Sequence, residues 1–265
     1  MFTPYDFNEA LGHRKEYIEE GLREGSPVVG LAYDGGMLLL TLRRTQRKIY
    51  EIYDRQMFSA IGKQSDIEDI RRSMIQIAHQ EGFERSPDDV SVQRLIGFAL
   101  SPALKKAFGD QFGTMPFVVR GLFAEMGRNP GADMFVTLNY DGEFRAYTGA
   151  AVIAGAREAE ERMRERIGEP DPKWTRDEAL RKALSAWIVG AREALRRSFR
   201  GRNEEEDEFN PLRDIEEADS DAVFLRDELK TATLEVGVLE RRANRESHFR
   251  LLTEAELEPL LKEVK

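Results

Sequence analysis

The densest group of side chains capable of chemistry lies in residues 203–221, where ten carboxylates accompany a single arginine, Arg213. The acidic residues are Glu204, Glu205, Glu206, Asp207, Glu208, Asp214, Glu216, Glu217, Asp219 and Asp221. Carboxylates bind hard cations such as Ca²⁺, but this spacing matches no EF-hand loop. Like charges at such density repel one another and resist packing. We therefore predict a solvated, flexible loop, partly neutralised by the arginines just upstream, rather than a metal site.

The remaining candidate residues form no familiar catalytic pattern. His13, His79 and His248 are widely separated in the sequence, and no H-E-x-x-H, G-x-S-x-G, Walker or dinucleotide-binding glycine motif is present. The chain has no cysteine, which excludes disulfides and thiolate metal sites. The residues by themselves thus predict no cofactor and no bound metal.

Composition narrows the class of protein further. A chain of 265 residues with 41% hydrophobic residues can form one large domain, and we take residues 1–265 as a single domain. The net charge of −9 argues against nucleic acid as a partner, because phosphate binding needs a basic face. No apolar run approaches the roughly 18 residues that a membrane span needs, and no secretory signal is evident. We expect a cytoplasmic protein.

The N-terminal segment has the pattern of an amphipathic helix. Apolar residues recur at three- to four-residue spacing over residues 7–24, with Asp6 placed as N-cap and Gly25 as the natural stop. Taken alone, such a helix packs on its own domain.

Paired apolar runs predict β-hairpins. Residues 28–33 and 37–42 are joined by Asp34 and Gly35, a dipeptide suited to a turn with positive φ. These runs are nearly continuous rather than alternating, which indicates strands covered on both faces. Asp141 and Gly142 mark a second hairpin. The other predicted strands are residues 49–53, 57–61, 117–125, 134–140, 143–147, 231–240 and 248–252.

Helical stripes separate these groups of strands. The stripes run over residues 67–78, 92–107, 156–167 and 175–197, and a short C-terminal helix follows a capping box of Thr253 and Glu256. The order is strands, two helices, strands, two helices, strands. Two largely antiparallel sheets, with a helix pair on each outer face, would bury every stripe. We predict an α+β fold, a four-layer α-β-β-α sandwich.

Several stretches together resemble the proteasome α subunits, particularly those of bacteria, which have the Ntn-hydrolase fold. The matching stretches are residues 24–36, 48–55, 58–63, 70–76 and 234–239. The resemblance runs from about residue 5 to the C-terminus and departs at the acidic loop. It implies the same four-layer sandwich.

The resemblance also implies assembly and function. Such subunits form homo-heptameric rings that cap a double ring of catalytic β subunits, so we expect a non-catalytic subunit that gates substrate entry. A ring-shaped AAA ATPase would dock on it and deliver protein substrates tagged with a prokaryotic ubiquitin-like protein. An alternative is a self-processed peptidase, and another is a ring that works without separate β subunits.

The family resemblance places Ser26 where catalytic relatives have their nucleophile. A nucleophile of that class must be the first residue, so that its free amine or a water can act as base. Lys48 stands at the place of the catalytic lysine and Arg44 also matches, but Leu42 replaces the acidic residue. Pro27 adds a rigid ring beside Ser26. With residues 1–25 in front of Ser26 as a kept gate segment, we predict no catalytic residue.

Lys48 takes another role in the α subunits that this chain resembles. There it lines a pocket between neighbouring subunits that receives the C-terminal carboxylate of the ATPase, with Gly62 as the matching backbone position. Without the family, Lys48 reads as a solvated surface lysine. Tyr5, Asp6 and Tyr17 resemble the gate cluster of the family, although its usual proline has no counterpart here. The simpler interpretation is a cap at Asp6 and two core aromatics.

Overall fold

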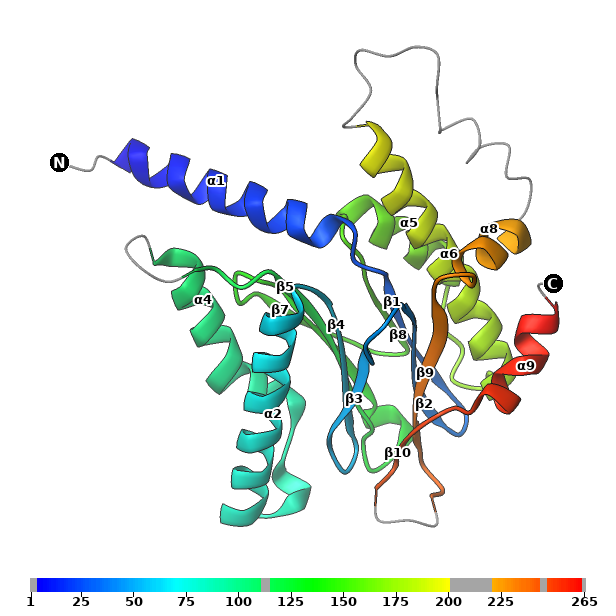
Figure 1. Ribbon diagram of the computed structural model, residues 1–265. Coiled ribbons are helices and arrows are strands. Elements are labelled where there is room, and N and C mark those ends of the chain that lie inside the picture. The colour runs from blue at the N-terminus through cyan, green and yellow to red at the C-terminus, as the bar shows by residue number, and fades with distance from the viewer. Residues whose placement is uncertain (1–3, 111–114, 201–220, 244–246, 264–265) are drawn as a thin grey trace, which may run out of the picture.

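Two five-stranded antiparallel sheets are stacked at the centre of the molecule (Figure 1). The computed structural model describes residues 4–110, 115–200, 221–243 and 247–263. The first sheet has the order β10-β9-β2-β1-β8, with strands β1 (Val28–Tyr33), β2 (Gly36–Arg43), β8 (Ala150–Ile153), β9 (Thr233–Glu240) and β10 (Phe249–Leu251). The second has the order β3-β4-β5-β6-β7, with strands β3 (Ile49–Tyr53), β4 (Gln56–Gly62), β5 (Val119–Glu125), β6 (Met134–Leu138) and β7 (Phe144–Tyr147).

Helices cover the outer face of each sheet, which confirms the predicted α+β four-layer sandwich (Figure 1). The second sheet carries α2 (Gln64–Glu84), α3 (Val92–Leu95), the π-helical turn η2 (Ile96–Leu100) and α4 (Ser101–Gly109). The first carries α5 (Arg157–Ile167), α6 (Arg176–Arg200), α8 (Asp221–Glu228) and α9 (Glu254–Glu263). Short 3-10 turns occupy η1 (Pro87–Asp89) and η3 (Pro130–Ala132). Within these ranges, no helix is both long enough and apolar enough to span a membrane.

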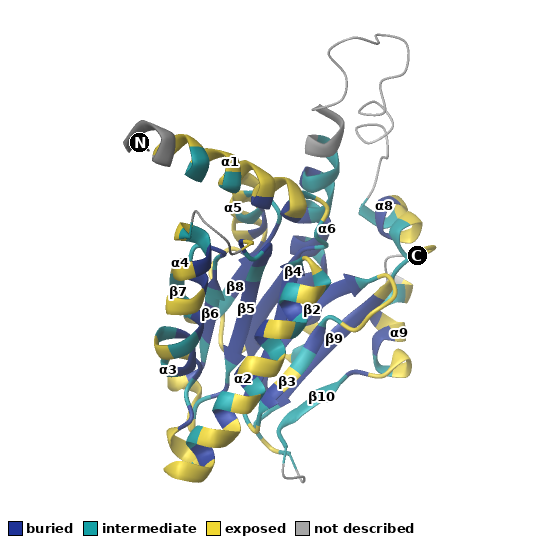
Figure 2. Ribbon diagram, turned by 60° about the vertical axis from the view of Figure 1, so that its left-hand side comes forward, coloured by how far each residue is buried: buried dark blue, intermediate teal, exposed yellow. Residues whose placement is uncertain are grey.

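Strand β2 shows why its sequence is continuously apolar. Met37 and Leu39 point into the core between the two sheets, whereas Leu38 and Leu40 point into the core beneath α5 and α6. Both sets are fully buried, as the dark blue strands of Figure 2 show. Because each face of the strand meets another layer, alternation with polar residues is lost, as predicted.

The turn between β1 and β2 forms as predicted, but the positive φ is at a different residue. Gly36 has φ 151°, and neither Asp34 nor Gly35 has a positive value. A Cβ at Gly36 would collide with the carbonyl oxygen of Leu239 on β9. Glycine is thus required here by the close approach of β9 as well as by the turn.

Helix α1 (Pro4–Arg23) begins before the predicted N-cap. Asp6 therefore lies inside the first turn, and the prediction that it caps the helix is wrong. Pro4 suits the first helical position because its fixed φ matches the helix and its missing N–H would be unpaired there anyway.

Two elements escaped prediction because packing creates them. Strand β8 has only four residues, and its pairing with β1, Val29 opposite Val152, makes it a strand. Helix α8 begins at Asp221, the last residue of the predicted acidic loop. The Asp221 carboxylate lies 3.2 Å from Arg192 and 3.4 Å from Arg166, one from each of the two neighbouring helices. The rest of that loop, residues 203–220, lies outside the described residues.

The C-terminal half of α1 joins the helix to the sandwich. Ile18 and Leu22 are fully buried in the core between the sheets. Arg14 donates from one Nη to the carbonyl oxygens of Ala107 and Phe108, at 2.9 and 3.3 Å. Those carbonyls belong to the last turn of α4, where helical acceptors lack partners within the helix.

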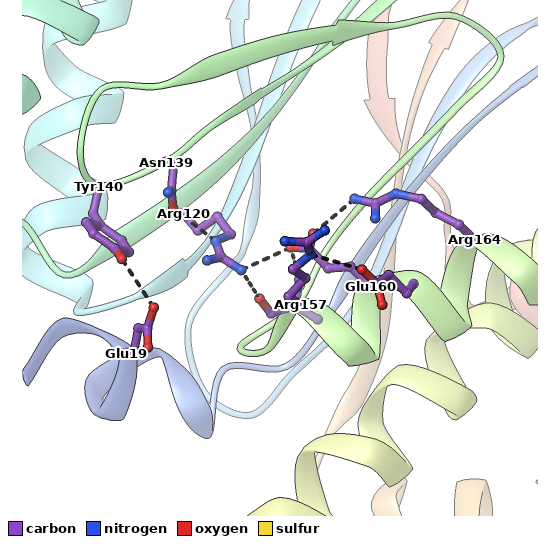
Figure 3. A network of polar contacts seen from close by, with 9 residues as sticks. Glu19, Arg120, Asn139, Tyr140, Arg157, Glu160 and Arg164 are labelled. Carbon is purple, nitrogen blue, oxygen red and sulfur yellow. Dashed lines mark hydrogen bonds and ion pairs between the residues drawn. The ribbon is translucent and has the colours of Figure 1, made fainter. Parts of the chain in front are cut away.

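A polar network lies beside this junction (Figure 3). Arg120 of β5 donates to Glu160 Oε1 at 3.1 Å and to the carbonyl oxygen of Ala154 at 2.8 Å, while Arg164 donates to Glu160 Oε2 at 3.0 Å. Tyr140 donates to Glu19 of α1 at 3.3 Å. Burial, and next the charge of Glu19, raises the Tyr140 pKa to about 12, so this hydroxyl keeps its proton at neutral pH.

The network predicts that Glu160→Gln destabilises the fold. The change removes a carboxylate that accepts hydrogen bonds from Arg120, Arg164 and the Ala154 N–H. The largely buried guanidinium of Arg120 then lacks its oppositely charged partner. We expect a loss of about 2 kcal/mol in the free energy of unfolding, measured with urea at fixed protein concentration.

Glu161→Gln is the matched control on the same helix, because its pair with Arg157 is exposed. It should change the free energy of unfolding by less than about 0.5 kcal/mol. Equal effects of the two substitutions would contradict a special role for Glu160.

Candidate functional site

A cavity of about 610 Å³ opens where the end of α1 meets both sheets and α6. The segment that leaves α1, the loop between β2 and β3, the end of β4, the start of α2 and one face of α6 all contribute to its wall. Lys48 and Gly62, which the sequence places far from Ser26, line the same cavity as Ser26. The fold thus brings together the predicted pocket residues and the predicted position of a nucleophile.

The Lys48 side chain reaches inward to uncharged acceptors. Its Nζ donates to the carbonyl oxygen of Ser26 at 2.8 Å and to Thr41 Oγ1 at 3.3 Å. No carboxylate lies within ion-pair distance of this ammonium among the residues that the structure describes. Lys48 is half-buried, so the interpretation as a solvated surface lysine is wrong.

Burial lowers the pKa of Lys48 from its ordinary value of 10.5 to about 7, and the charge of Glu235 only partly opposes this effect. Removing an ammonium from water disfavours its charged form unless an opposite charge compensates. A strongly shifted pKa in a cavity is a physical indication of a functional residue.

Glu235 of β9 places Lys48 through its backbone. Its Oε1 accepts the N–H groups of Lys48 at 3.0 Å and of Ile49 at 2.7 Å. Its Oε2 lies 2.9 Å from Arg43 Nε, an ion pair without the alignment of a hydrogen bond. This carboxylate therefore determines where β3 begins and how Lys48 enters the cavity.

The Ser26 hydroxyl lies in the same group of polar side chains. Trp187 Nε1 of α6 donates to Ser26 Oγ at 3.3 Å, and Thr41 Oγ1 is 3.4 Å away. The Ser26 nitrogen is a peptide nitrogen, because α1 and Gly25 precede it without a break. Leu42 is buried at the cavity wall. An apolar side chain therefore occupies the position at which the family resemblance implies an acidic residue in catalytic relatives.

Gly62 lies at the cavity with φ 124°. A Cβ at this position would collide with the carbonyl oxygen of Val118 on the neighbouring chain segment. The absence of a side chain is thus required by the close approach of β4 to that segment, a reason that the sequence did not reveal.

The predicted gate residues are only partly described. Tyr5 and Asp6 belong to the first turns of α1, and their side chains lie outside the described residues. Tyr17 is 50% exposed, so it is not a core aromatic.

Three further residues of the site escaped sequence analysis: Thr41, Trp187 and Glu235. The sequence did contain a signal for Glu235, because this acidic residue interrupts the apolar run of residues 234–239. In the structure the Glu235 side chain is only 5% exposed. A charge within a buried strand needs partners, which could have marked it. Thr41 and Trp187 left none, since hydroxyls and aromatics are ordinary in strands and helices.

Comparison with known proteins gives consistent matches. Residues 22–197 match the family described as Proteasome subunit. A "Proteasome subunit alpha" of Xylanimonas cellulosilytica is 32% identical over 154 residues, which are 57% of this chain and 61% of that protein. Proteins of the same name from Frankia casuarinae and Kineococcus radiotolerans are each 30% identical, over 72% and 70% of this chain and 79% and 78% of theirs. The chain thus spans about three fifths of the length of the Xylanimonas protein.

The shifted pKa of Lys48 predicts a pH-dependent difference in stability between the parent chain and Lys48→Met. Below pH 7, Lys48 is charged in both the folded and the unfolded chain. The buried charge then lowers the free energy of unfolding by its full amount. Between about pH 7 and 10.5 the unfolded chain binds more protons, and the parent therefore gains stability as pH rises.

The gain over Lys48→Met should approach about 1.4 kcal/mol per pH unit at most, measured by urea unfolding from pH 6.5 to 9.5. Lys63→Met is the control, because Lys63 is exposed and lies outside the cavity wall. Parallel pH profiles of the parent and Lys48→Met would contradict the shift.

Proposed function

This chain belongs to the proteasome subunit family, and from that premise we propose that it is a non-catalytic α-ring subunit of a 20S proteasome core particle. The relatives from Frankia casuarinae and Kineococcus radiotolerans carry the name proteasome subunit alpha, in agreement with the resemblance seen in the sequence. The ring would contain seven copies and would stack on a ring of β subunits in the cytoplasm.

The packing of α1 is the observation that carries the non-catalytic assignment. Ile18 and Leu22 are fully buried between the sheets, and Gly25 N bonds to the Leu22 carbonyl oxygen at 3.0 Å. Cleavage before Ser26 would remove these side chains and expose the core that they fill, at a cost of a few kcal/mol. Retention of residues 1–25 leaves Ser26 without the free amine that its class of nucleophile needs.

The cavity at Lys48 supports docking of an ATPase tail. A C-terminal carboxylate that is partly removed from water needs a cation or N–H donors, and Lys48 supplies a cation at the cavity wall. Arg44 and Arg47 add positive charge, while Tyr50, Ala191 and Leu195 provide contacts for an apolar side chain. The protein that supplies this C-terminal carboxylate would be a ring-shaped AAA ATPase that delivers proteins tagged with a prokaryotic ubiquitin-like protein.

Helix α1 supports the gating role. It projects from the sandwich, and its N-terminal part lies away from the body (Figures 1 and 2). In a ring, the half-exposed Tyr17 would be available to a neighbouring subunit, and Tyr5 and Asp6 would lie nearer the pore. These three residues are the proposed gate, and Lys48 with Gly62 forms the proposed docking site.

One observation favours the alternative, a self-processed peptidase that uses Ser26. Lys48 and Thr41 lie at Ser26, and a lysine with a lowered pKa is suited to proton transfer. The missing acidic partner and the packed α1 weigh against this alternative.

Assembly tests the proposal directly. Co-expression with a proteasome β subunit from the same genome should produce a four-ring stack by electron microscopy, because α rings cap the β rings. The intact mass of this chain in the stack should correspond to residues 1–265. A complex without β rings, or a chain that lacks residues 1–25, would overturn the proposal, the latter in favour of the peptidase.

Lys48→Ala should leave the ring assembled but weaken activation by the ATPase tail. Loss of a charge-assisted contact to a carboxylate corresponds to roughly tenfold to hundredfold weaker binding of a tail peptide. The measurement is peptide-stimulated hydrolysis of a fluorogenic substrate by the assembled complex. Lys63→Ala is the control, because Lys63 is exposed and lies outside the cavity wall. If tail peptides stimulate Lys48→Ala as well as the parent, the docking assignment is wrong.

A further inference from the structure

The Lys48 amine sits in an open cavity that also holds unpaired positive charge, and this combination suits reaction with an anionic electrophile. We propose that Lys48 is an acylation site, modified by small acyl phosphates that enter the cavity. The consequence for regulation rests on the proposed function, since an acylated Lys48 could no longer receive the carboxylate of an ATPase tail. The modification itself requires only this chain.

The hydrogen bonds around Lys48 position a nitrogen that can react. Thr41 Oγ1 donates its proton to the Pro27 carbonyl oxygen at 2.7 Å, so toward Lys48 it acts as an acceptor. The Ser26 carbonyl is an acceptor by nature. Two N–H groups of Lys48 therefore donate hydrogen bonds to the cavity wall, one to the Ser26 carbonyl oxygen and one to Thr41 Oγ1. The third substituent position on the nitrogen makes neither of these bonds. In the neutral amine that position is the lone pair, which is the nucleophile.

The charges at the cavity mouth favour an anionic donor. Arg44 and Arg47 are exposed on the loop between β2 and β3, and neither side chain has an ion-pair partner among the described residues. Glu24 and Glu228 also line the cavity, so the mouth is not uniformly positive. The two guanidiniums lie on the same loop as Lys48, and guanidinium is the group that best matches phosphate oxygens.

The protonation state of Lys48 supports reaction at neutral pH. With a pKa of about 7, about half of the molecules carry the neutral amine at pH 7. An ordinary lysine is neutral in roughly one molecule in 2,500 at that pH. The charged or titratable groups near Lys48, on every element that packs around it, are Arg23, Glu24, Arg43, Arg44, Arg47, Tyr50, Glu228 and Glu235. Glu235 is the one whose charge raises the Lys48 pKa, and it does not overcome burial.

The reaction needs no group beyond the amine and the acyl phosphate. The Lys48 nitrogen attacks the carbonyl carbon, an N–C bond forms, and the C–O bond to phosphate breaks. Inorganic phosphate leaves with the electron pair of that bond, and the proton lost from nitrogen passes to phosphate or to water. The product is a neutral amide. It removes the Lys48 ammonium from the cavity wall and fills part of the space.

Acetyl phosphate is the probe that tests the proposal on the full-length chain. The rate of acetylation at each lysine is measured by peptide mass spectrometry between pH 6 and 9. Lys48 should be acetylated at least about tenfold faster than Lys63 at pH 7, because its larger neutral fraction outweighs its lower basicity. Its rate should level off above about pH 7, whereas the rate at an ordinary exposed lysine keeps rising over this range.

Acetylation of Lys48 no faster than that of Lys63 would overturn the proposal. The arginines are tested by the double variant Arg44→Gln and Arg47→Gln, compared with acetyl phosphate and with an uncharged aryl acetate. We expect the rate at Lys48 to fall several-fold with acetyl phosphate only. An equal rate with acetyl phosphate in the parent and the variant would refute the assignment of an anionic donor.

A final measurement separates this inference from the proposed function. The assembled complex, acetylated at Lys48, is compared with unmodified complex for stimulation by a tail peptide. Loss of stimulation supports the regulatory consequence. Rapid acetylation without any loss overturns that consequence and leaves the acylation site in place, whereas slow acetylation with a Lys48-dependent tail response refutes only the acylation site.

Discussion

The buried carboxylate of Glu235 is the interaction on which the cavity depends. It belongs to β9 of the first sheet, yet it accepts the backbone N–H groups where β3 of the second sheet begins. A charge that is 5% exposed must have such donors, since water cannot supply them. Glu235 thereby joins the two sheets at one end of the sandwich. The loop that carries Arg44, Arg47 and Lys48 enters the cavity from this fixed point.

Helix α1 completes the same end of the molecule and explains why the site has its present chemistry. Its C-terminal part enters the core through Ile18 and Leu22, and the chain then passes directly into Ser26 and β1. The segment that anchors α1 in the core thus continues directly into the segment that forms part of the cavity wall. A serine held there by peptide bonds on both sides offers its carbonyl oxygen to Lys48 instead of a free amine. The half-buried lysine consequently lies beside neutral acceptors, and its removal from water is the physical cause of its lowered pKa.

Much of the fold could be predicted because local pattern and layer packing agree. Continuous apolar runs such as residues 37–42 have one explanation in a sheet, burial on both faces, and β2 shows it. One half of the predicted capping box of Thr253 and Glu256 forms, because the Glu256 carboxylate accepts the Thr253 N–H at 2.9 Å. Predictions failed where a partner decides the structure: β8 exists because β1 pairs with it, and Asp221 starts α8 beside Arg192 and Arg166.

The sequence by itself determined the four-layer architecture and the family resemblance, and it singled out Ser26, Lys48 and Gly62 as candidate residues. These follow from periodicity and residue order, which are properties of the chain. Only the tertiary structure decided what surrounds Lys48, because Thr41, Trp187 and Glu235 come from three separate elements. Solvation and pKa depend on such through-space neighbours, and their distances are set when the layers pack. The same holds for Gly62, whose need for glycine arises from its φ of 124° and from the Val118 carbonyl oxygen across the strands.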